Sequence, residues 1–225
     1  VRGHIAANYI THPELEPPFV CLCVSGGTTL IVDVRDYTEM EILGATRDDA
    51  AGECFDKVAR VLGIGYPGGA PMDRLSRTGD AGRYAFPRVQ VHDAPLDMSF
   101  SGLKTAAINL IHNARQKEEA LDLPSLAASF SAAVSDMLVP RVMEVARRCG
   151  RRKVAVAGGV AANSRIRADL EAACAAAGCR LYLPPLSLCG DNGAMIGCQA
   201  YYEYLAGHTA DMALNAYANR DIAKG

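Results

Sequence analysis

Short apolar runs alternate with short polar segments over the first 46 residues, which is the pattern of consecutive β-strands. Apolar or β-branched runs occupy residues 19–24, 29–34 and about 39–46. Because only a few residues join them, neighbouring strands must be antiparallel. The opening stretch, VRGHIAANYI, instead has the pattern expected in the middle of a helix. The pattern predicts a helix followed by a three-strand meander.

Helical periodicity replaces this alternation from residue 48. In DDAAGECFDKVARVLG one helical face carries Ala51, Phe55, Val58 and Leu62. Gly63 is placed to end this helix, because glycine adopts the left-handed conformation of a C-terminal cap. YPGGAP, at residues 66–71, predicts a loop.

Two long helical patterns come next. KTAAINLIHNARQKEEA is amphipathic, and a second pattern runs from Pro124 to Gly150. Pro140 lies inside the second pattern. Proline lacks a backbone N–H and clashes with the preceding turn, so a kink or a split is expected there.

Strands and helices alternate after residue 150. KVAVAGG and RLYLPP have the pattern of buried strands, whereas ANSRIRADLEAACAAAG and AMIGCQAYYEYLAG have that of helices. Short joints imply a right-handed crossover and a parallel strand pair. A three-strand meander followed by parallel β-α-β units, with a helical insert between them, is typical of an actin-like (ASKHA, ribonuclease-H-like) α/β lobe.

This order also predicts how the chain is divided. Val1 stands where a helix is already under way, so we expect a fragment of a longer protein. Residues 1–18 are expected to be the tail of a missing N-terminal lobe. Residues 19–206 are expected to form the C-terminal actin-like lobe with its insert at about 72–150, and residues 207–225 a C-terminal tail.

Composition and charge narrow the functional classes. The net charge of −2 gives no bulk electrostatic case for nucleic acid. The basic clusters at 147–148 and 151–153 fit helix C-terminal charges as well as RNA contacts. Eight cysteines without a CxxC pair favour a reducing compartment. With no signal peptide and no apolar run long enough to span a bilayer, we expect a cytoplasmic protein that contacts no membrane.

The turn SGGTT, at residues 25–29, has two interpretations. Adjacent glycines between β-branched runs are a hairpin signal. Glycines also let successive backbone N–H groups converge on an anion, with hydroxyl groups beside them. The pattern alone leaves both interpretations open.

Other polar residues stand where parallel strands end or helices begin. Asn163 follows a strand and the pair Gly158-Gly159, and it could cap a helix or bind a ligand. Asp191 could likewise be an N-cap or a carboxylate metal ligand. Asp56 has the pattern of a surface residue and Asp73 that of another cap. His4 could equally be a solvated histidine.

Together, six stretches resemble the TsaD family of tRNA N(6)-adenosine threonylcarbamoyltransferases, from residue 1 to about residue 206. They are SGG (25–27), DDAAGECFDK (48–57), YPGG (66–69), SFSGLKT (99–105), AGGVAANSRIR (157–167) and CGDNGAM (189–195). SFSGLKT is similar to the bacterial or organellar branch. The resemblance implies transfer of threonylcarbamoyl from threonylcarbamoyl-adenylate to N6 of the adenosine at tRNA position 37.

The resemblance also implies site residues, a metal and partners. The loop contacting the adenylate would comprise Cys23, Val24, Ser25, Gly26 and Gly27, with Asp56, Gly69, Asp73 and Asn163 around the adenylate. One divalent metal ion per subunit, with iron favoured over zinc, would be held by His4 and Asp191. The implied partners are tRNA, a homologous dimerisation subunit and a small ATPase.

The chain departs from the family pattern in three places. The first histidine of the family's HxxxH motif would lie before Val1, Thr28 and Leu30 replace a histidine and a glutamine, and PGGA replaces PGGP, with Pro71 one residue later. Two alternatives stay open beside the enzyme. They are the carbamoyltransferase domain of a hydrogenase-maturation protein, and a non-catalytic paralogue that acts as a scaffold.

Overall fold

A five-stranded mixed sheet is the centre of the molecule in a computed structural model that describes residues 1–215 and 222. Its strands are β1 (Phe19–Val24), β2 (Thr29–Val34), β3 (Met40–Ala45), β4 (Lys153–Ala157) and β5 (Arg180–Tyr182). The order is β3-β2-β1-β4-β5, with β1–β2 and β2–β3 antiparallel and β1–β4 and β4–β5 parallel. The predicted α/β lobe, with its meander and parallel units, is confirmed.

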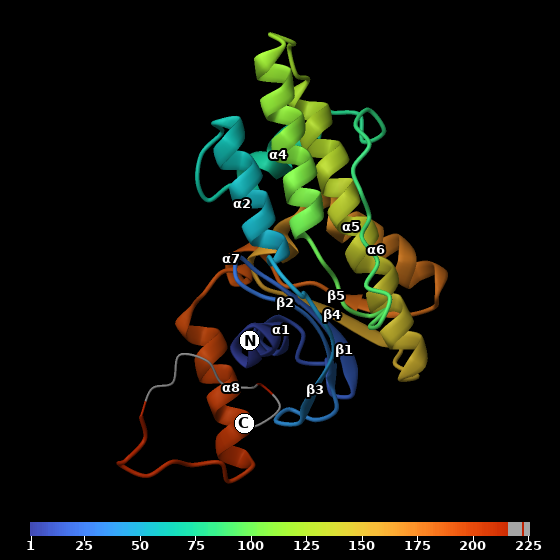
Figure 1. The fold of residues 1–225 in the computed structure, drawn as a ribbon. Coiled ribbons are helices and arrows are strands. Elements are labelled where there is room, and N and C mark those ends of the chain that lie inside the picture. The colour runs from blue at the N-terminus through green and yellow to red at the C-terminus, as the bar shows by residue number, and fades with distance from the viewer. Residues whose placement is uncertain (216–221, 223–225) are drawn as a thin grey trace.

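Helices cover both faces of this sheet. Alternate residues of β1 point into two separate apolar cores, Phe19 and Cys21 into one and Val20 and Leu22 into the other. On the first face α1 (Arg2–Thr11) packs against β4, and α8 (Gly193–Leu205) packs against α1. On the second face lie α5 (Leu123–Arg148) and α6 (Ser164–Ala176), as Figure 1 shows.

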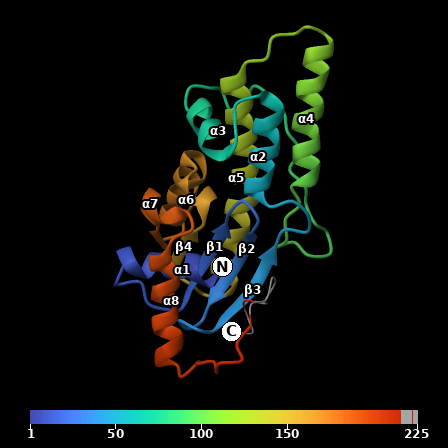
Figure 2. The same cartoon turned by 90° about the vertical axis from the view of Figure 1, so that its left-hand side faces the viewer.

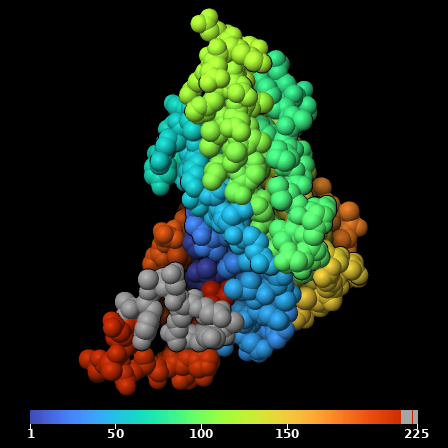
Figure 3. All heavy atoms as spheres, viewed as in Figure 1, coloured from blue at the N-terminus to red at the C-terminus, as the bar shows by residue number. Residues whose placement is uncertain are grey.

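A group of helices extends beyond the sheet on the side where the parallel strands end. It contains α2 (Ala51–Leu62), α3 (Gly69–Ser76) and α4 (Ser101–Gln116), which stand beside α5 in Figure 2. Helix α4 and the loop after it form the narrow end of the molecule in Figure 3. The edge-to-face ring contacts of Phe130 with Phe55 and Phe86 continue the core of the second sheet face into this group.

Most predicted elements have the expected bounds, and the exceptions are short. Strands β1 and β2 begin and end at the predicted residues, and Gly63 ends α2 with φ of +78°. The loop predicted at 66–71 is wrong in its second half because α3 begins at Gly69. Pro71 lies in the first helical turn, where the missing N–H has no helical partner to lose. Two four-residue helices, η1 (Gly159–Ala162) and α7 (Leu186–Cys189), were not predicted.

A kink or a split was expected at Pro140, and α5 is one unbroken helix with Pro140 inside it, so there is no split. By length and composition this helix could cross a membrane, contrary to the expectation from its sequence, and 78% of its apolar window is buried in the molecule. That burial is typical of a core helix. Part of the predicted C-terminal tail (216–221 and 223–225) lies outside the described residues.

Candidate functional site

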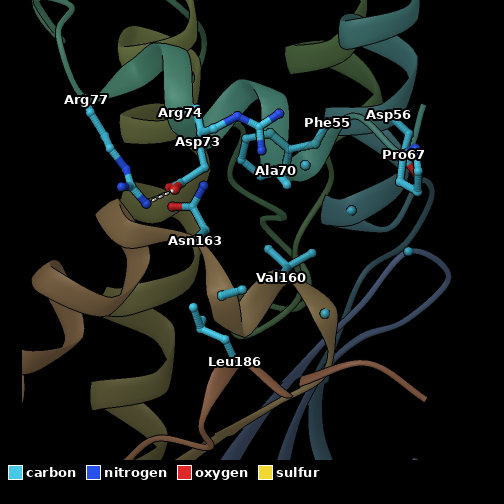
Figure 4. Close-up of a pocket in the computed structure, with 15 residues that line it drawn as sticks. Phe55, Asp56, Pro67, Ala70, Asp73, Arg74, Arg77, Val160, Asn163 and Leu186 are labelled. Carbon is cyan, nitrogen blue, oxygen red and sulfur yellow. Dashed lines mark hydrogen bonds and ion pairs between the residues drawn. The ribbon is translucent and has the colours of Figure 1, made fainter. Parts of the chain in front are cut away.

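A pocket of about 510 Å³ lies between the α2–α3 segment and the chain that follows β4. This is the carboxyl end of the parallel strands, where ligands bind in open α/β sheets. Figure 4 shows the side chains from α3 above the pocket and those of Val160 and Leu186 below it. The lining residues are Gly26, Gly52, Phe55, Asp56, Pro67, Gly69, Ala70, Asp73, Arg74, Arg77, Gly159, Val160, Ala162, Asn163 and Leu186.

The β1–β2 turn borders this pocket through Gly26. Ser25 N donates to Thr28 O over 2.8 Å and Thr28 N donates to Ser25 Oγ over 3.1 Å, so the turn is a hairpin. Neither Gly26 nor Gly27 has a left-handed φ, and a Cβ on either would meet nothing within 4 Å. Their N–H groups bond to no acceptor among the described residues. The fold therefore does not require these two glycines, and two exposed donors remain for a ligand.

Two other glycines hold the turn in place. Gly52 N donates to Ser25 O over 3.2 Å, and a Cβ on Gly52 would lie 2.4 Å from that oxygen. Gly158 has φ of +95°, and a Cβ there would lie 2.4 Å from Val24 O. Both positions thus require glycine, because the backbones approach too closely for any side chain. The turn is fixed between the start of α2 and the end of β4.

Asp56 positions the loop between α2 and α3. Its Oδ1 accepts a hydrogen bond from Gly68 N over 2.6 Å, although Asp56 also lines the pocket. A Cβ on Gly68 would lie 2.3 Å from the Cβ of Ala59, so the loop packs tightly on α2. Asp56 is therefore more than the surface residue that its helical position indicated, and it brings Gly69 to the pocket.

Asp73 connects the two walls of the pocket. Its Oδ1 accepts from both the N and the Oγ of Ser164 at 2.7 Å, and its Oδ2 accepts from Arg77 at 2.8 Å (Figure 4). Burial acts to raise the pKa of Asp73, but the hydrogen bonds from Ser164 and Arg77 outweigh it and hold that pKa below the usual value. Asp73 lies inside α3, so the prediction that it caps its own helix is wrong.

Asn163 is an N-cap that also lines the pocket, and its ligand contact stays a prediction. Its Oδ1 accepts from Ile166 N over 3.1 Å, which makes it the N-cap of α6, and the residue also lines the pocket. Figure 4 places its amide group directly below Asp73. A cap and a ligand contact are compatible, since the amide nitrogen is not used by the cap.

Arg74 is the pocket's available cation. It lies on α3 and is exposed, and it makes no ion pair or hydrogen bond with the described residues. In Figure 4 its side chain extends over the pocket toward Phe55, whereas Arg77 turns to Asp73. The pocket therefore offers a guanidinium group and free backbone donors, which together favour an anionic ligand.

His4 and Asp191 lie side by side although 187 positions separate them. His4 Nε2 is 3.0 Å from Asp191 Oδ1, with the His4 side chain 16% exposed and that of Asp191 90% exposed. Burial lowers the pKa of His4 although Asp191 acts in the opposite direction, which favours the neutral imidazole that binds metals. Asn192, not Asp191, caps α8 by accepting from Met195 N at 2.9 Å. The solvated-histidine and N-cap interpretations of these two residues are thus wrong.

The two side chains fit part of a metal site. Two ligands that each lie about 2.1 Å from one ion, at right angles about it, are themselves about 3 Å apart, and His4 Nε2 and Asp191 Oδ1, in direct contact here, have that separation. His4 Nδ1 is buried without a partner among the described residues, so only Nε2 is placed to share an ion with Asp191. No cluster of three or more His, Cys, Asp or Glu residues occurs in 1–215 and 222. Further ligands must come from elsewhere.

The predicted site residues thus fall into three groups. Cys23 and Val24 are buried in β1 and, like Ser25 and Gly27, do not line the pocket, whereas His4 and Asp191 form their own pair. Those that line the pocket are Gly26, Asp56, Gly69, Asp73 and Asn163. Their assignment to an adenylate stays a prediction. Sequence reasoning missed Arg74, whose signal was its place next to Asp73 on one helix, and Gly52.

Two of the stretches that carry the resemblance also bind each other, through Asp48 and Asp49 of the first and residues 99–104 of the second. Asp48 Oδ1 accepts from Phe100 N at 2.7 Å and from Ser101 N at 3.1 Å, which caps the start of α4. Asp48 Oδ2 accepts from the hydroxyl groups of Ser99 and Ser101. Lys104 binds Asp49. These contacts fix the chain just before α2, and thereby Gly52 against the glycine turn.

Comparison with known proteins gives one family. The sequence model of "TsaD: tRNA N6-adenosine threonylcarbamoyltransferase" matches residues 1–198. A tRNA N6-adenosine threonylcarbamoyltransferase of Clostridium botulinum (strain 657 / Type Ba4) is 48% identical over 224 residues, covering 100% of this chain and 66% of the relative. One of Clostridium perfringens (strain ATCC 13124) is 47% identical over 219 residues, covering 97% and 65%. The chain therefore spans slightly less than two thirds of these relatives.

Solved structures agree on the fold. Full-length HypF in a phosphate- and nucleotide-bound form superposes with a TM-score of 0.68 at 13% identity, over 91% of this chain and 35% of that one. HypF of T. kodakarensis gives 0.65 at 15% identity, over 92% and 36%. At such identities the likeness concerns the fold alone.

Proposed function

The chain belongs to the tRNA N6-adenosine threonylcarbamoyltransferase (TsaD) family, and from this we propose that its protein transfers threonylcarbamoyl from threonylcarbamoyl-adenylate to N6 of adenosine 37 in tRNA. One observation supports this pocket as the site of the proposed reaction. The pocket is lined by Gly26, whose N–H has no acceptor among the described residues, and by the exposed, unpaired Arg74, beside an apolar wall that contains Phe55 and Val160. Such a wall suits a nucleoside, and the donors suit its phosphate.

We assign the adenylate phosphate to the turn and Arg74. The Gly52 and Gly158 contacts hold the turn rigid, so its N–H groups need no reorganisation when the ligand arrives. Asn163 can donate its free amide N–H to the nucleoside. Asp73 is already occupied by Ser164 and Arg77, so its role is to hold α3 and α6 at a fixed separation.

The reaction is acyl transfer to an amine. The N6 atom attacks the carbamoyl carbon of the mixed anhydride, a C–N bond forms, and the bond from that carbon to the phosphate oxygen breaks. AMP leaves with the electron pair of that bond, and N6 loses one proton. The residues of this chain contribute positioning and electrostatic stabilisation, because the guanidinium and backbone donors lie where negative charge develops on the leaving phosphate.

His4 and Asp191 would hold the proposed divalent metal ion, iron or zinc, together with ligands from outside the described residues. When bound, such an ion supplies Lewis-acid polarisation of an oxygen of the substrate. The chain path joins this pair to the pocket, since α7 starts at the pocket-lining Leu186 and ends two residues before Asp191. We propose the homologous subunit and small ATPase as partners of the intact protein.

The family match favours this function over the two alternatives. A scaffold subunit needs neither the His4–Asp191 pair nor unpartnered donors around a pocket. The hydrogenase-maturation branch is expected to lack the FDK and SFSGLKT stretches, and this chain has both.

The test uses the intact protein with its partners, unmodified tRNA and threonylcarbamoyl-adenylate. We expect threonylcarbamoyladenosine in nucleoside digests, detected by mass spectrometry, and about one metal ion per subunit. Asp191→Ala should abolish stoichiometric metal and leave the helical content near wild type. The matched control is Asn192→Ala, which removes the α8 cap and should lower stability by about 1 kcal/mol while the metal stays bound. Full metal content in Asp191→Ala would contradict the metal assignment.

A further inference from the structure

Tyr66 is an exposed aromatic residue that adjoins the pocket in sequence. It precedes Pro67, which lines the pocket beside Asp56 and far from Arg77 in Figure 4. Its relative exposure is 69%, and its ring contacts no other ring in the described part of the chain. Burial therefore does not explain a tyrosine here, and its flat face is available to a ligand.

One arginine lies over this ring, and a second binds the end of the helix that precedes it. The Arg60 guanidinium lies over the Tyr66 ring, 5.4 Å from its centroid. Arg115, from α4, donates to Val61 O at 2.5 Å, which brings a second guanidinium group to the end of α2. Neither arginine forms an ion pair with a carboxylate among the described residues, in contrast to Lys57 one turn earlier, which binds Asp49 and Glu53. One positive charge without a carboxylate partner thus lies over the exposed ring, and a second lies at the end of α2.

We propose that Tyr66, Arg60 and Arg115 form a docking surface for single-stranded RNA at the mouth of the pocket. One base stacks on the ring face that Arg60 leaves open, and neighbouring phosphates lie against the two guanidinium groups. Stacking on an aromatic ring, combined with nearby positive charge, is how proteins hold unpaired nucleotides. The proposal rests on the proposed function, which needs an unpaired loop nucleotide delivered to this pocket.

RNA is favoured over a protein partner by the chemistry of the surface. A protein-binding surface would be expected to offer contiguous apolar side chains, whereas here the exposed ring of Tyr66 is covered on one face by the charged Arg60. Affinity should therefore depend on salt and on unpaired bases. Since the net charge of −2 does not itself attract RNA, the case for RNA binding depends on Arg60 and Arg115.

The experiment measures binding of the intact protein to a synthetic anticodon stem-loop with adenosine at position 37, and to a blunt RNA duplex of similar length. Tyr66→Ala should raise the Kd for the stem-loop about tenfold, since stacking of one base contributes about 1–3 kcal/mol. The duplex should be affected less than twofold. Tyr66→Phe should stay within twofold of wild type, because stacking needs the ring and not the hydroxyl.

Matched controls separate this surface from general effects. Tyr204→Ala removes a tyrosine of the same exposure (70%) on α8 and should leave RNA affinity unchanged. Arg60→Gln should lower the slope of log Kd against log salt by about 1, as loss of one phosphate contact does. The Kd for the adenylate should not change in Tyr66→Ala, since only Pro67 of this pair lines the pocket.

Two results would overturn the docking surface: stem-loop affinity within twofold of wild type in Tyr66→Ala, or weaker association with a protein partner while RNA affinity is intact. The second result would assign the surface to that protein. Failure of the proposed function is distinct, because the wild-type protein would then modify no tRNA at all. Wild-type modification together with intact Tyr66→Ala binding rejects only the present inference.

Discussion

Gly26 and Gly52 lie beside the same pocket, yet a side chain at each would have a different effect. At Gly26 an added Cβ meets no atom within 4 Å, whereas at Gly52 it meets Ser25 O at 2.4 Å. The first glycine leaves space that a ligand can use, and the second is required by the packing of α2 on the turn. Substitution at the two positions can therefore distinguish ligand binding from folding.

Gly26→Val should weaken adenylate binding with little loss of stability. The isopropyl group would occupy the pocket next to the free N–H groups, and we expect the Kd to rise at least tenfold, or about 1.4 kcal/mol. The thermal midpoint should stay within a few degrees of wild type because φ at Gly26 is not left-handed. Calorimetric titration with a non-hydrolysable adenylate analogue measures the affinity.

Gly52→Ala is the control for that substitution. Its methyl group would push the α2 backbone away from Ser25, so we expect a clearly lower thermal midpoint even though alanine favours helices more than glycine does. If Gly26→Val binds the adenylate normally, the turn is a hairpin only and the phosphate lies elsewhere.

Sequence patterns identified the polar residues near the site but not which of two neighbours has which role. Asp191 and Asn192 are both good N-cap residues, and spacing alone cannot distinguish them. The three-dimensional structure does so because α1 places His4 against Asp191 while Asn192 caps α8. A contact between residues so distant in sequence leaves no local pattern, and the same holds for Asp73 and Ser164.

At the scale of elements, the contact between Asp48 and the start of α4 links two segments of the helical group. The carboxylate accepts from two backbone N–H groups and two hydroxyl groups. Burial acts to raise the pKa of Asp48, but the bonds from Ser99 and Ser101 outweigh it and lower that pKa below its usual value. Ionised Asp48 thus stabilises the folded state.

Asp48→Asn should lower the stability of the intact protein by about 1 kcal/mol at pH 7, as loss of a capping carboxylate does. Because the pKa is lower in the folded state, the wild-type advantage is complete above the unfolded pKa of about 3.9. It should disappear as the pH falls through the lowered folded value, where Asp48 is protonated. Urea unfolding between about pH 7 and pH 3 measures this convergence.

The matched control is Asp93→Asn, which removes an exposed carboxylate that bonds to no described residue. Its stability should equal wild type at each pH. A gap between Asp48→Asn and wild type that persists to low pH would mean that geometry, and not charge, accounts for the contribution of Asp48.

The fold was predictable wherever an element was long enough to show a period. Strands β1 and β2 contain uninterrupted β-branched and apolar residues bounded by turns, and α2 ends at a glycine. Helices η1 and α7 have four residues each, about one turn, which is too short for an apolar repeat. Pro140 is tolerated inside α5 because packing on both the sheet and α3 holds that helix together.

At the scale of the whole molecule, most basic side chains of the described residues bind carboxylates or backbone carbonyls of this chain. Arg147 and Arg148 bind Glu144, and Arg151 binds Asp33 at 2.8 Å. Arg152 donates to Ala177 O over 2.9 Å. These side chains are thus bound within the fold, which disfavours RNA contacts by the two clusters. Among the described residues, the side chains of Arg60 and Arg74 have no hydrogen bond or ion pair, and that of Arg115 binds only the Val61 carbonyl.

Residues 1–225 alone should therefore bind tRNA weakly and transfer no threonylcarbamoyl group. We expect a Kd above about 1 μM at physiological salt, within the range of non-specific binding. The described residues also supply only two donors, His4 and Asp191, to the proposed metal site. Fluorescence anisotropy with labelled tRNA measures the affinity, with circular dichroism to verify folding. Submicromolar binding or modified tRNA would show that the fragment carries a complete site.

The bonds between Asp73 and Ser164 limit the side from which a ligand can enter or leave the pocket. They join α3, from the helical group, to the first residue of α6, beside the sheet. Separating these walls would break both bonds and leave the Asp73 carboxylate and the Ser164 N–H without partners. This side of the pocket is therefore expected to stay closed. Under the proposed function, the adenylate and AMP are then expected to exchange over the opposite rim, near Pro67.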